Sequence, residues 1–153
     1  MADTYTQLRV HIVFSVLGRD NLIQKQYRQE VEKYITALIQ KRRHKLLAIY
    51  CMPDHTHIFI GWHPAQGISV LVEQVKKLSK TFINDKKWMK FRFDWQRGYG
   101  AFSYSKSQTD AVVKYILNQE QHHKKRTFKE EYLDLLNKFE IDYKEEYLFE
   151  FYE

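Results

Sequence analysis

The stretch from Met52 to Ile60 constrains the fold of this chain most, because two histidines open an apolar, β-branched run. The Pro-Asp pair at positions 53 and 54 is typical of a tight turn just before the run. If the run is a strand, successive side chains alternate between its faces, so His55 and His57 point to the same side. One face can then be buried, while the other offers two imidazoles to a single metal ion. The spacing alone also fits two ordinary sheet histidines that bond to their neighbours.

The hydrophobic pattern around this stretch predicts an α+β protein. Alternating residues before position 17 predict a half-buried first strand, and apolar residues at helical spacing predict amphipathic helices. Ser107 with Asp110, and Thr127 with Glu130, resemble capping boxes that begin the last two helices. The glycines at 98 and 100 predict a turn or the close approach of another part of the backbone. Strands are expected over 7–16, 45–52, 55–60, 91–96 and 101–105, and helices over 24–43, around 68–82, from 107 and from 127.

This order of elements favours a ferredoxin-like (RRM-like) antiparallel sheet with helices packed on one face and an additional C-terminal helix. At 153 residues, 44% of them apolar, the chain fits a single domain over 1–153. No run approaches the roughly 18 apolar residues of a membrane span, and the N-terminus lacks the order of a signal peptide. Cys51 is the only cysteine, so it is expected to be a core residue of a cytoplasmic protein rather than a disulfide partner or nucleophile.

Charge is distributed unevenly along the chain. Residues 1–126 carry 22 basic and 10 acidic side chains, whereas 127–153 carry 3 basic and 9 acidic ones. We interpret this as a basic catalytic core followed by an acidic C-terminal helix and tail, and a basic core is typical of a polyanion binder. Lysines that only keep a surface soluble would give the same count. Candidate phosphate contacts are Arg19, Lys76, Lys77, Lys80, Arg97, His122, Lys124 and Lys125.

A second segment offers a nucleophile. Tyr115 and Gln119 are four residues apart on a predicted helix, so they share one of its faces. If this face meets the histidine face of the sheet, His55, His57 and the Gln119 carbonyl form a ligand set suited to Mg²⁺ or Mn²⁺. The ion would polarise a phosphate that Tyr115 attacks as a phenolate. The chain contains 11 tyrosines, and a tyrosine on an amphipathic helix is more often a packing residue.

Three motifs occurring in order resemble one known family. They are MPDHTH at 52–57, GYGAFS at 98–103 and YILNQEQHH at 115–123. Together they resemble the HUH single-tyrosine transposases of small bacterial insertion sequences, whose relatives include the REP-associated tyrosine transposases. The resemblance extends over nearly the whole chain. Two departures are Thr56, where a larger hydrophobic residue is usual, and the sequence VLGR at 16–19, which lacks the usual lysine at the exit of the first strand.

The resemblance implies a ferredoxin-like fold, a homodimer and hairpin-bearing single-stranded DNA as substrate. It implies a divalent ion held by His55, His57 and Gln119, and a 5′-phosphotyrosine intermediate on Tyr115. Such a link conserves the energy of the broken phosphodiester, so a second DNA end can be joined without ATP. In related enzymes the tyrosine helix can complete the site of the partner subunit.

Three functions are therefore open from the sequence. The first is a metal-dependent transposase that cleaves and rejoins single-stranded DNA through Tyr115. The second is a non-catalytic, domesticated module that binds single-stranded nucleic acid. The third is a small histidine-metal phosphoesterase in which water attacks. A covalent protein–DNA adduct separates the first from the others.

Overall fold

The computed structural model describes residues 3–153, and these contain a four-stranded antiparallel sheet with the strand order β2-β3-β1-β4. The strands are β1 (Arg9–Ser15), β2 (Lys45–Cys51), β3 (His55–Gly61) and β4 (Gly100–Tyr104). The helices are α1 (Arg28–Lys41), α2 (Ile68–Lys86), α3 (Thr109–Leu117), α4 (Gln119–His122) and α5 (Phe128–Lys138). Short 3-10 turns are η1 (Arg19–Asn21), η2 (Lys25–Tyr27), η3 (Lys106–Gln108) and η4 (Glu145–Tyr147).

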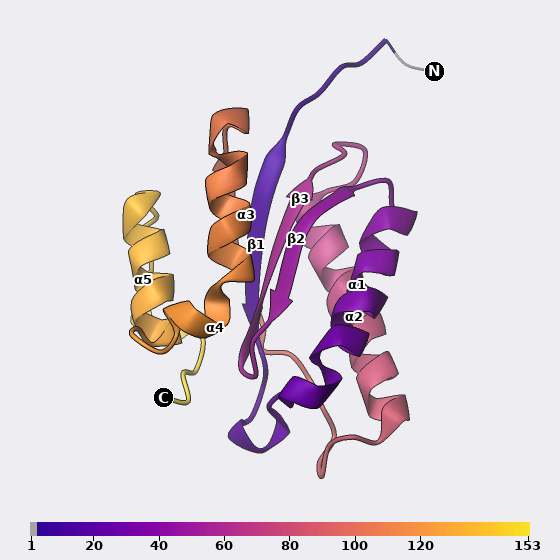
Figure 1. The fold of residues 1–153 in the computed structure, drawn as a ribbon, viewed down its shortest axis with the longest axis vertical. Coiled ribbons are helices and arrows are strands. Elements are labelled where there is room, and N and C mark those ends of the chain that lie inside the picture. The colour runs from indigo at the N-terminus through magenta and orange to yellow at the C-terminus, as the bar shows by residue number, and fades with distance from the viewer. Residues whose placement is uncertain (1–2) are drawn as a thin grey trace.

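The sheet is covered on both faces (Figure 1). Helices α1 and α2 lie on one side, whereas α3, α4 and α5 lie on the other. The α+β class, the antiparallel sheet and the C-terminal helix are therefore confirmed, but the helices cover both faces of the sheet rather than one. With both faces covered, β1 is buried along almost its whole length rather than half-buried.

The two faces of β3 follow the predicted alternation. Ile58 and Ile60 join the main core beneath α1 and α2. Phe59, on the other face, packs with Val112 and Ile116 of α3 in a second, smaller core. This second core holds α3 against the face that carries both histidines, and so it determines where the side chains of α3 can reach.

The chain between α2 and α3 differs from its prediction. Residues 91–96 form no strand apart from a single bridge between Trp95 and Val16. Gly98 has a φ of +84°, the conformation that favours glycine at a turn. At Gly100 the close approach is made by a side chain, because a Cβ there would lie 2.8 Å from the hydroxyl of Tyr132 on α5.

The capping box of the third main helix uses other residues than predicted. Ser105 and Gln108 form it, so the helical region begins before Ser107 and continues from η3 into α3. The box formed by Thr127 and Glu130 at the start of α5 is confirmed. Helix α3 ends at Leu117, and Gln119 consequently lies on the separate helix α4.

The acidic C-terminal part is packed into the domain. Phe128 and Phe149 belong to the main core. The side-chain amide of Gln96 donates to the carbonyl of Glu150 at 2.8 Å, and the carboxylate of Glu153 accepts the Phe128 N–H at 2.6 Å. None of the helices formed by residues 3–153 is long and apolar enough to cross a membrane.

Candidate active site

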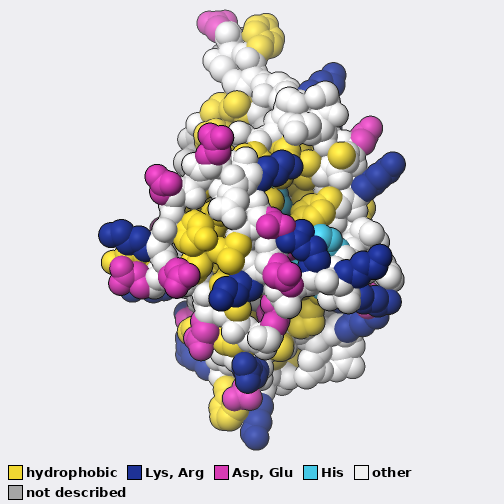
Figure 2. Space-filling view, turned by 90° about the vertical axis from the view of Figure 1, so that its left-hand side faces the viewer, with side chains coloured by type: hydrophobic (Ala, Val, Ile, Leu, Met, Phe, Trp, Pro, Cys, Tyr) yellow, Lys and Arg dark blue, Asp and Glu magenta, His cyan; other side chains and the backbone are white. Residues whose placement is uncertain are grey.

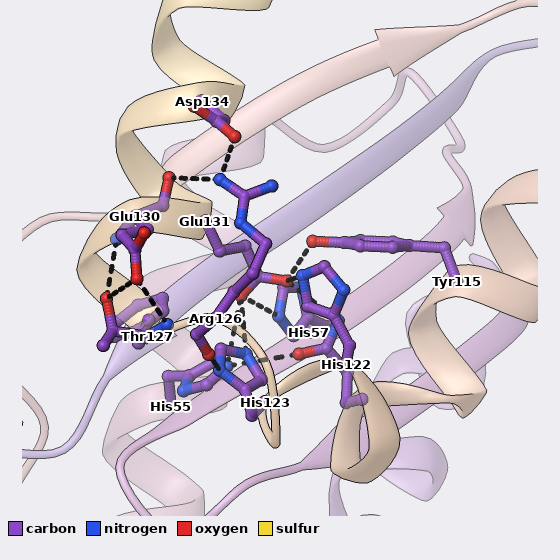
Figure 3. A network of polar contacts seen from close by, with 12 residues as sticks. His55, His57, Tyr115, His122, His123, Arg126, Thr127, Glu130, Glu131 and Asp134 are labelled. Carbon is purple, nitrogen blue, oxygen red and sulfur yellow. Dashed lines mark hydrogen bonds and ion pairs between the residues drawn. The ribbon is translucent and has the colours of Figure 1, made fainter.

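The paired histidines and the tyrosine meet in space as the sequence predicts (Figure 3). His55 and His57 leave β3 on the same face, and both are fully buried. Helix α3 carries Tyr115 to this face, where its ring centroid lies 5.8 Å from that of His57. The phenol is therefore beside the imidazoles within a single chain.

Gln119 also reaches the site, although it lies on α4 rather than on the helix of Tyr115. Its Oε1 lies 3.4 Å from Nε2 of His55, and it is fully buried. Helix α4 is held in place by Glu120, whose carboxylate accepts hydrogen bonds from Lys25 at 2.7 Å and from Tyr50 at 3.2 Å. These contacts fix α4 to the β2 side of the sheet and keep the amide of Gln119 directed inward.

At the centre of the site is a residue that the sequence analysis missed, Glu131 of α5. This carboxylate is only 2% exposed. Tyr115 donates a hydrogen bond to its Oε2, and the amide of Gln119 donates to the same oxygen at 2.9 Å. A signal was present in the sequence, because residues 128, 131, 132 and 135 form an apolar stripe in which Glu131 is the one charged member.

The second missed residue is His123. The segment 122–126 was interpreted as a basic helix end, but Nε2 of His123 lies 3.0 Å from Oε1 of Glu131. The same oxygen lies 3.2 Å from Nε2 of His57 and 3.5 Å from Nε2 of His55. One ligand atom from each of these four residues lies within 4.8 Å of the others, so they could hold a metal ion together.

Each of the three imidazoles is also held by its other nitrogen. Nδ1 of His55 lies 2.7 Å from the carboxylate of Asp54, and Nδ1 of His57 lies 2.7 Å from Nε2 of His11. Nδ1 of His123 lies 2.9 Å from the carbonyl oxygen of Arg126. Partners of this kind fix the ring orientation of metal-binding histidines.

The site distributes charge unequally among its members. Burial opposes charge on His55, but the carboxylates of Asp54 and Glu131 outweigh it and raise the pKa of His55 to about 9. Burial lowers the pKa of His57, and burial together with His57 lowers the pKa of His11 well below its usual value. Burial would raise the pKa of Glu131, but the surrounding imidazoles lower it strongly.

The same environment keeps the phenol protonated. Burial and the Glu131 carboxylate raise the pKa of Tyr115 above its ordinary value. A phenolate beside a buried carboxylate is therefore costly unless positive charge enters the site.

A cavity of about 360 Å³ opens beside the phenol, between α3 and α5. Its lining includes Tyr104, Tyr115 and Glu131, the cations Arg126 and Lys138, and Asp134, which forms an ion pair with Arg126. On the same side of the molecule, Figure 2 shows histidine surface among hydrophobic and basic side chains. The phenol is thus reachable from solvent through a hollow lined by both basic and acidic side chains.

The predicted phosphate contacts do not lie together. Lys76, Lys77 and Lys80 lie on α2, across the sheet from the histidines (Figure 1). Lys76 donates to the carbonyl oxygens of Gln96 at 2.8 Å and Gly98 at 2.5 Å, and Lys80 pairs with Asp94 at 3.3 Å.

The remaining predicted contacts divide into two groups. His122 is the last residue of α4, with its Nε2 3.5 Å from Oε2 of Glu131, and Lys124 and Lys125 follow the helix. Arg97 is exposed in the loop before β4, and Arg19 in η1 lies 6.0 Å from the ring centroid of Tyr152.

Solved structures share this fold at low sequence identity. A proposed transposase of Deinococcus radiodurans R1 is 18% identical with a TM-score of 0.60, over 78% of this chain and 95% of that one. A REP-associated tyrosine transposase bound to a REP hairpin is 17% identical with a TM-score of 0.59, over 80% of this chain and 73% of that one. A search of curated proteins finds no match to this chain.

The comparison with family models identifies the class of this protein as a transposase. More particularly, the model of the IS200-like transposase family matches residues 4–119, which is most of the chain. This chain belongs to that family. The match ends at Gln119, so His123 and Glu131 lie outside it.

Proposed function

We propose that this protein cleaves and rejoins single-stranded DNA by transesterification through Tyr115. One observation carries the proposal: the phenol of Tyr115 shares the Glu131 carboxylate with His57 and His123, directly beside a cavity open to solvent. A packing tyrosine would not need its hydroxyl in a cluster of metal-binding groups.

In the proposed reaction the Tyr115 oxygen attacks the scissile phosphorus. A bond forms between this oxygen and phosphorus, and the bond from phosphorus to the 3′ oxygen breaks. The products are a 5′-phosphotyrosine and a free 3′ hydroxyl. The hydrogen bond to Oε2 of Glu131 orients the phenol, the phenol proton passes to solvent through the cavity as the new bond forms, and the departing 3′ oxygen takes a proton from solvent. Attack by another 3′ hydroxyl reverses these steps and needs no ATP.

A divalent ion fits this site as an electrophile. His55, His57 and the Oε1 atom of Gln119 supply nitrogen and oxygen donors, as proposed from the sequence; Oε1 of Gln119 lies 3.4 Å from Nε2 of His55, and the two imidazole ring centroids lie 5.0 Å apart. When bound, such an ion would supply positive charge to the phosphate oxygens and lower the cost of a phenolate nearby. The chain's own part is to hold Tyr115, the donors and the entrance in one fixed arrangement.

We propose hairpin-bearing single-stranded DNA as the substrate, with cleavage in a reducing cytoplasm, where the buried thiol of Cys51 would remain free. Support comes from family membership and from the likeness in fold to a transposase bound to a REP hairpin. Arg126 and Lys138 line the cavity, and the exposed Lys124 and Lys125 directly precede Arg126 in the sequence. These cations would attract a phosphate backbone.

A homodimer was expected from the resemblance and remains part of the proposal. The arrangement of Tyr115, His55 and His57 within one chain favours catalysis in which each subunit uses its own tyrosine. Pairing of two chains would then serve to bring two DNA ends together.

The test is an incubation of the protein with hairpin-bearing single-stranded DNA and Mn²⁺ or Mg²⁺, followed by a denaturing gel. We expect a protein–DNA band that survives denaturation. Free cleavage products without this band would instead assign the protein to the phosphoesterases. Binding without cleavage would assign it to the non-catalytic modules.

His11 supplies a further prediction about the metal site. Its Nε2 bonds to His57, while its buried Nδ1 has no polar partner among residues 3–153. His11→Phe removes one unsatisfied buried nitrogen but leaves Nδ1 of His57 without its partner, so these two effects offset and the thermal unfolding temperature should change little. The substitution should weaken Mn²⁺ binding by roughly 10- to 100-fold, because His57 loses the partner that orients its ring. Isothermal titration calorimetry measures this, and unchanged affinity would remove His11 from the metal site.

A further inference from the structure

We propose that the metal centre of this protein is built from three imidazoles and one carboxylate: His55, His57, His123 and Glu131. It takes a transition-metal ion in preference to Mg²⁺. The inference deepens the proposed function. It rests on that function only for the role of the ion in DNA cleavage, and not for the identity of the ligands. Two of the four residues come from the C-terminal region that the family match does not include.

The first argument is convergence onto a single atom. Nε2 of His123, His57 and His55 lie 3.0, 3.2 and 3.5 Å from Oε1 of Glu131 (Figure 3). These nitrogens come from a strand and from the segment after α4, and the carboxylate comes from a third element, α5. Four ligand atoms within 4.8 Å of one another form a cage of the size that one ion can fill.

The second argument is that hydrogen bonding alone satisfies this cage poorly. A carboxylate oxygen has about two lone-pair sites, and here three ring nitrogens compete for Oε1. The other oxygen is already occupied by Tyr115 and Gln119. A cation at the centre would accept all three nitrogen lone pairs and the carboxylate charge together.

The third argument is the support behind each imidazole. The outer nitrogens of all three rings are bonded, to Asp54, to His11 and to the carbonyl of Arg126. Only the inner nitrogens are therefore available to a ligand. Carboxylate, carbonyl and similar acceptors behind the rings are typical of histidines that bind metal.

The donor set indicates which ion binds. Mg²⁺ prefers oxygen ligands and keeps several waters, whereas imidazole suits Zn²⁺, Ni²⁺ and Fe²⁺; Mn²⁺ binds a mixed nitrogen and oxygen set more weakly than these ions do. Three imidazoles with one carboxylate therefore favour a transition metal. Glu131 has a second task in this arrangement, because its Oε2 holds the phenol of Tyr115 and so positions the nucleophile relative to the ion.

The experiment measures Mn²⁺ affinity by isothermal titration calorimetry and the rise in unfolding temperature that Mn²⁺ causes. Glu131→Gln and His123→Ala should each weaken binding by at least roughly 10- to 100-fold and remove most of the rise. Glu130→Gln is the matched control, because it makes the same change one position away on α5 and keeps a residue suited to the capping box. His63→Ala, a histidine outside the cage, controls for His123→Ala. Both controls should bind as wild type does.

Two results would overturn the inference. One is wild-type Mn²⁺ affinity in both Glu131→Gln and His123→Ala; the other is displacement of bound Mn²⁺ by an equal concentration of Mg²⁺. If one of the two variants does not fold, the other still tests the ligand set, and the Mg²⁺ competition with wild-type protein tests the choice of ion. The proposed function is tested separately, by whether wild-type protein forms a covalent adduct with DNA. Such an adduct would support the proposed function even if the ion were held by His55, His57 and Gln119 alone.

Discussion

Tyr115→Phe should form no covalent adduct with hairpin-bearing single-stranded DNA, on any time scale at which wild-type protein reacts to completion. The change deletes the attacking oxygen and keeps the ring that packs against His57. Removal of a covalent nucleophile in other enzymes costs about 10⁴-fold or more in rate, so residual adduct should be undetectable on a denaturing gel. Metal binding and DNA binding should persist, because neither depends on the phenol oxygen in the proposed mechanism.

The matched control is Tyr34→Phe. Tyr34 lies on α1, across the sheet from the site, and stacks on Phe82, so the substitution deletes a hydroxyl without approaching the histidines. It should form adduct at the wild-type rate. An adduct of undiminished yield in Tyr115→Phe would show that another residue is the nucleophile, and peptide mapping of that adduct would identify it.

Most of the fold could be predicted from local patterns. The positions of His55 and His57 on one face follow from strand geometry alone, since the two-residue period leaves no other arrangement. The predicted turn at positions 53 and 54, across which β2 pairs with β3, and the capping box of Thr127 and Glu130 are likewise short-range features, and both are confirmed. Their causes act within a few residues, so a single sequence contains them.

Other features depend on contacts between distant segments. Ser107 with Asp110 fits a capping box, but Ser105 with Gln108 forms it, and the two options differ only in where the chain leaves β4. The break at Asn118 separates Gln119 from the helix of Tyr115, although a continuous helix would carry both on one face. Local spacing alone cannot choose between such options.

Two residues of the candidate site, Glu131 and His123, were not predicted from the sequence. Glu131 contacts His57 across 74 positions of sequence, and no local pattern links the two. The negative balance of the C-terminal region hides a single buried carboxylate among exposed ones. The position of Glu131, rather than its charge, could have indicated that it is buried, because it lies on the apolar stripe of α5. An acidic residue in such a stripe needs a buried partner, and three histidines provide it here.

His57→Ala is the second prediction with a large effect. It removes an imidazole that is fully buried beside the phenol, so cleavage should fall by at least about 100-fold and adduct should become undetectable at matched protein concentration. Affinity for single-stranded DNA should change little, because cations on the surface supply most of it. Electrophoretic mobility shift and the denaturing gel measure the two properties on the same samples. Normal cleavage by this variant would end the assignment of His57 to the metal site.

Mixing His57→Ala with Tyr115→Phe then decides whose tyrosine acts. In this structure Tyr115 and His57 of the same chain bond to opposite oxygens of one Glu131 carboxylate, so each chain forms its own complete site. Neither variant can repair the other under that arrangement, and the mixture should remain inactive after co-expression or joint refolding. If the tyrosine served the partner subunit instead, random pairing of the two variants in a twofold dimer would restore about a quarter of the sites. Recovery of that size would show that α3 exchanges between subunits when DNA is cut, whereas continued inactivity, with each variant still binding DNA, supports cleavage within one chain.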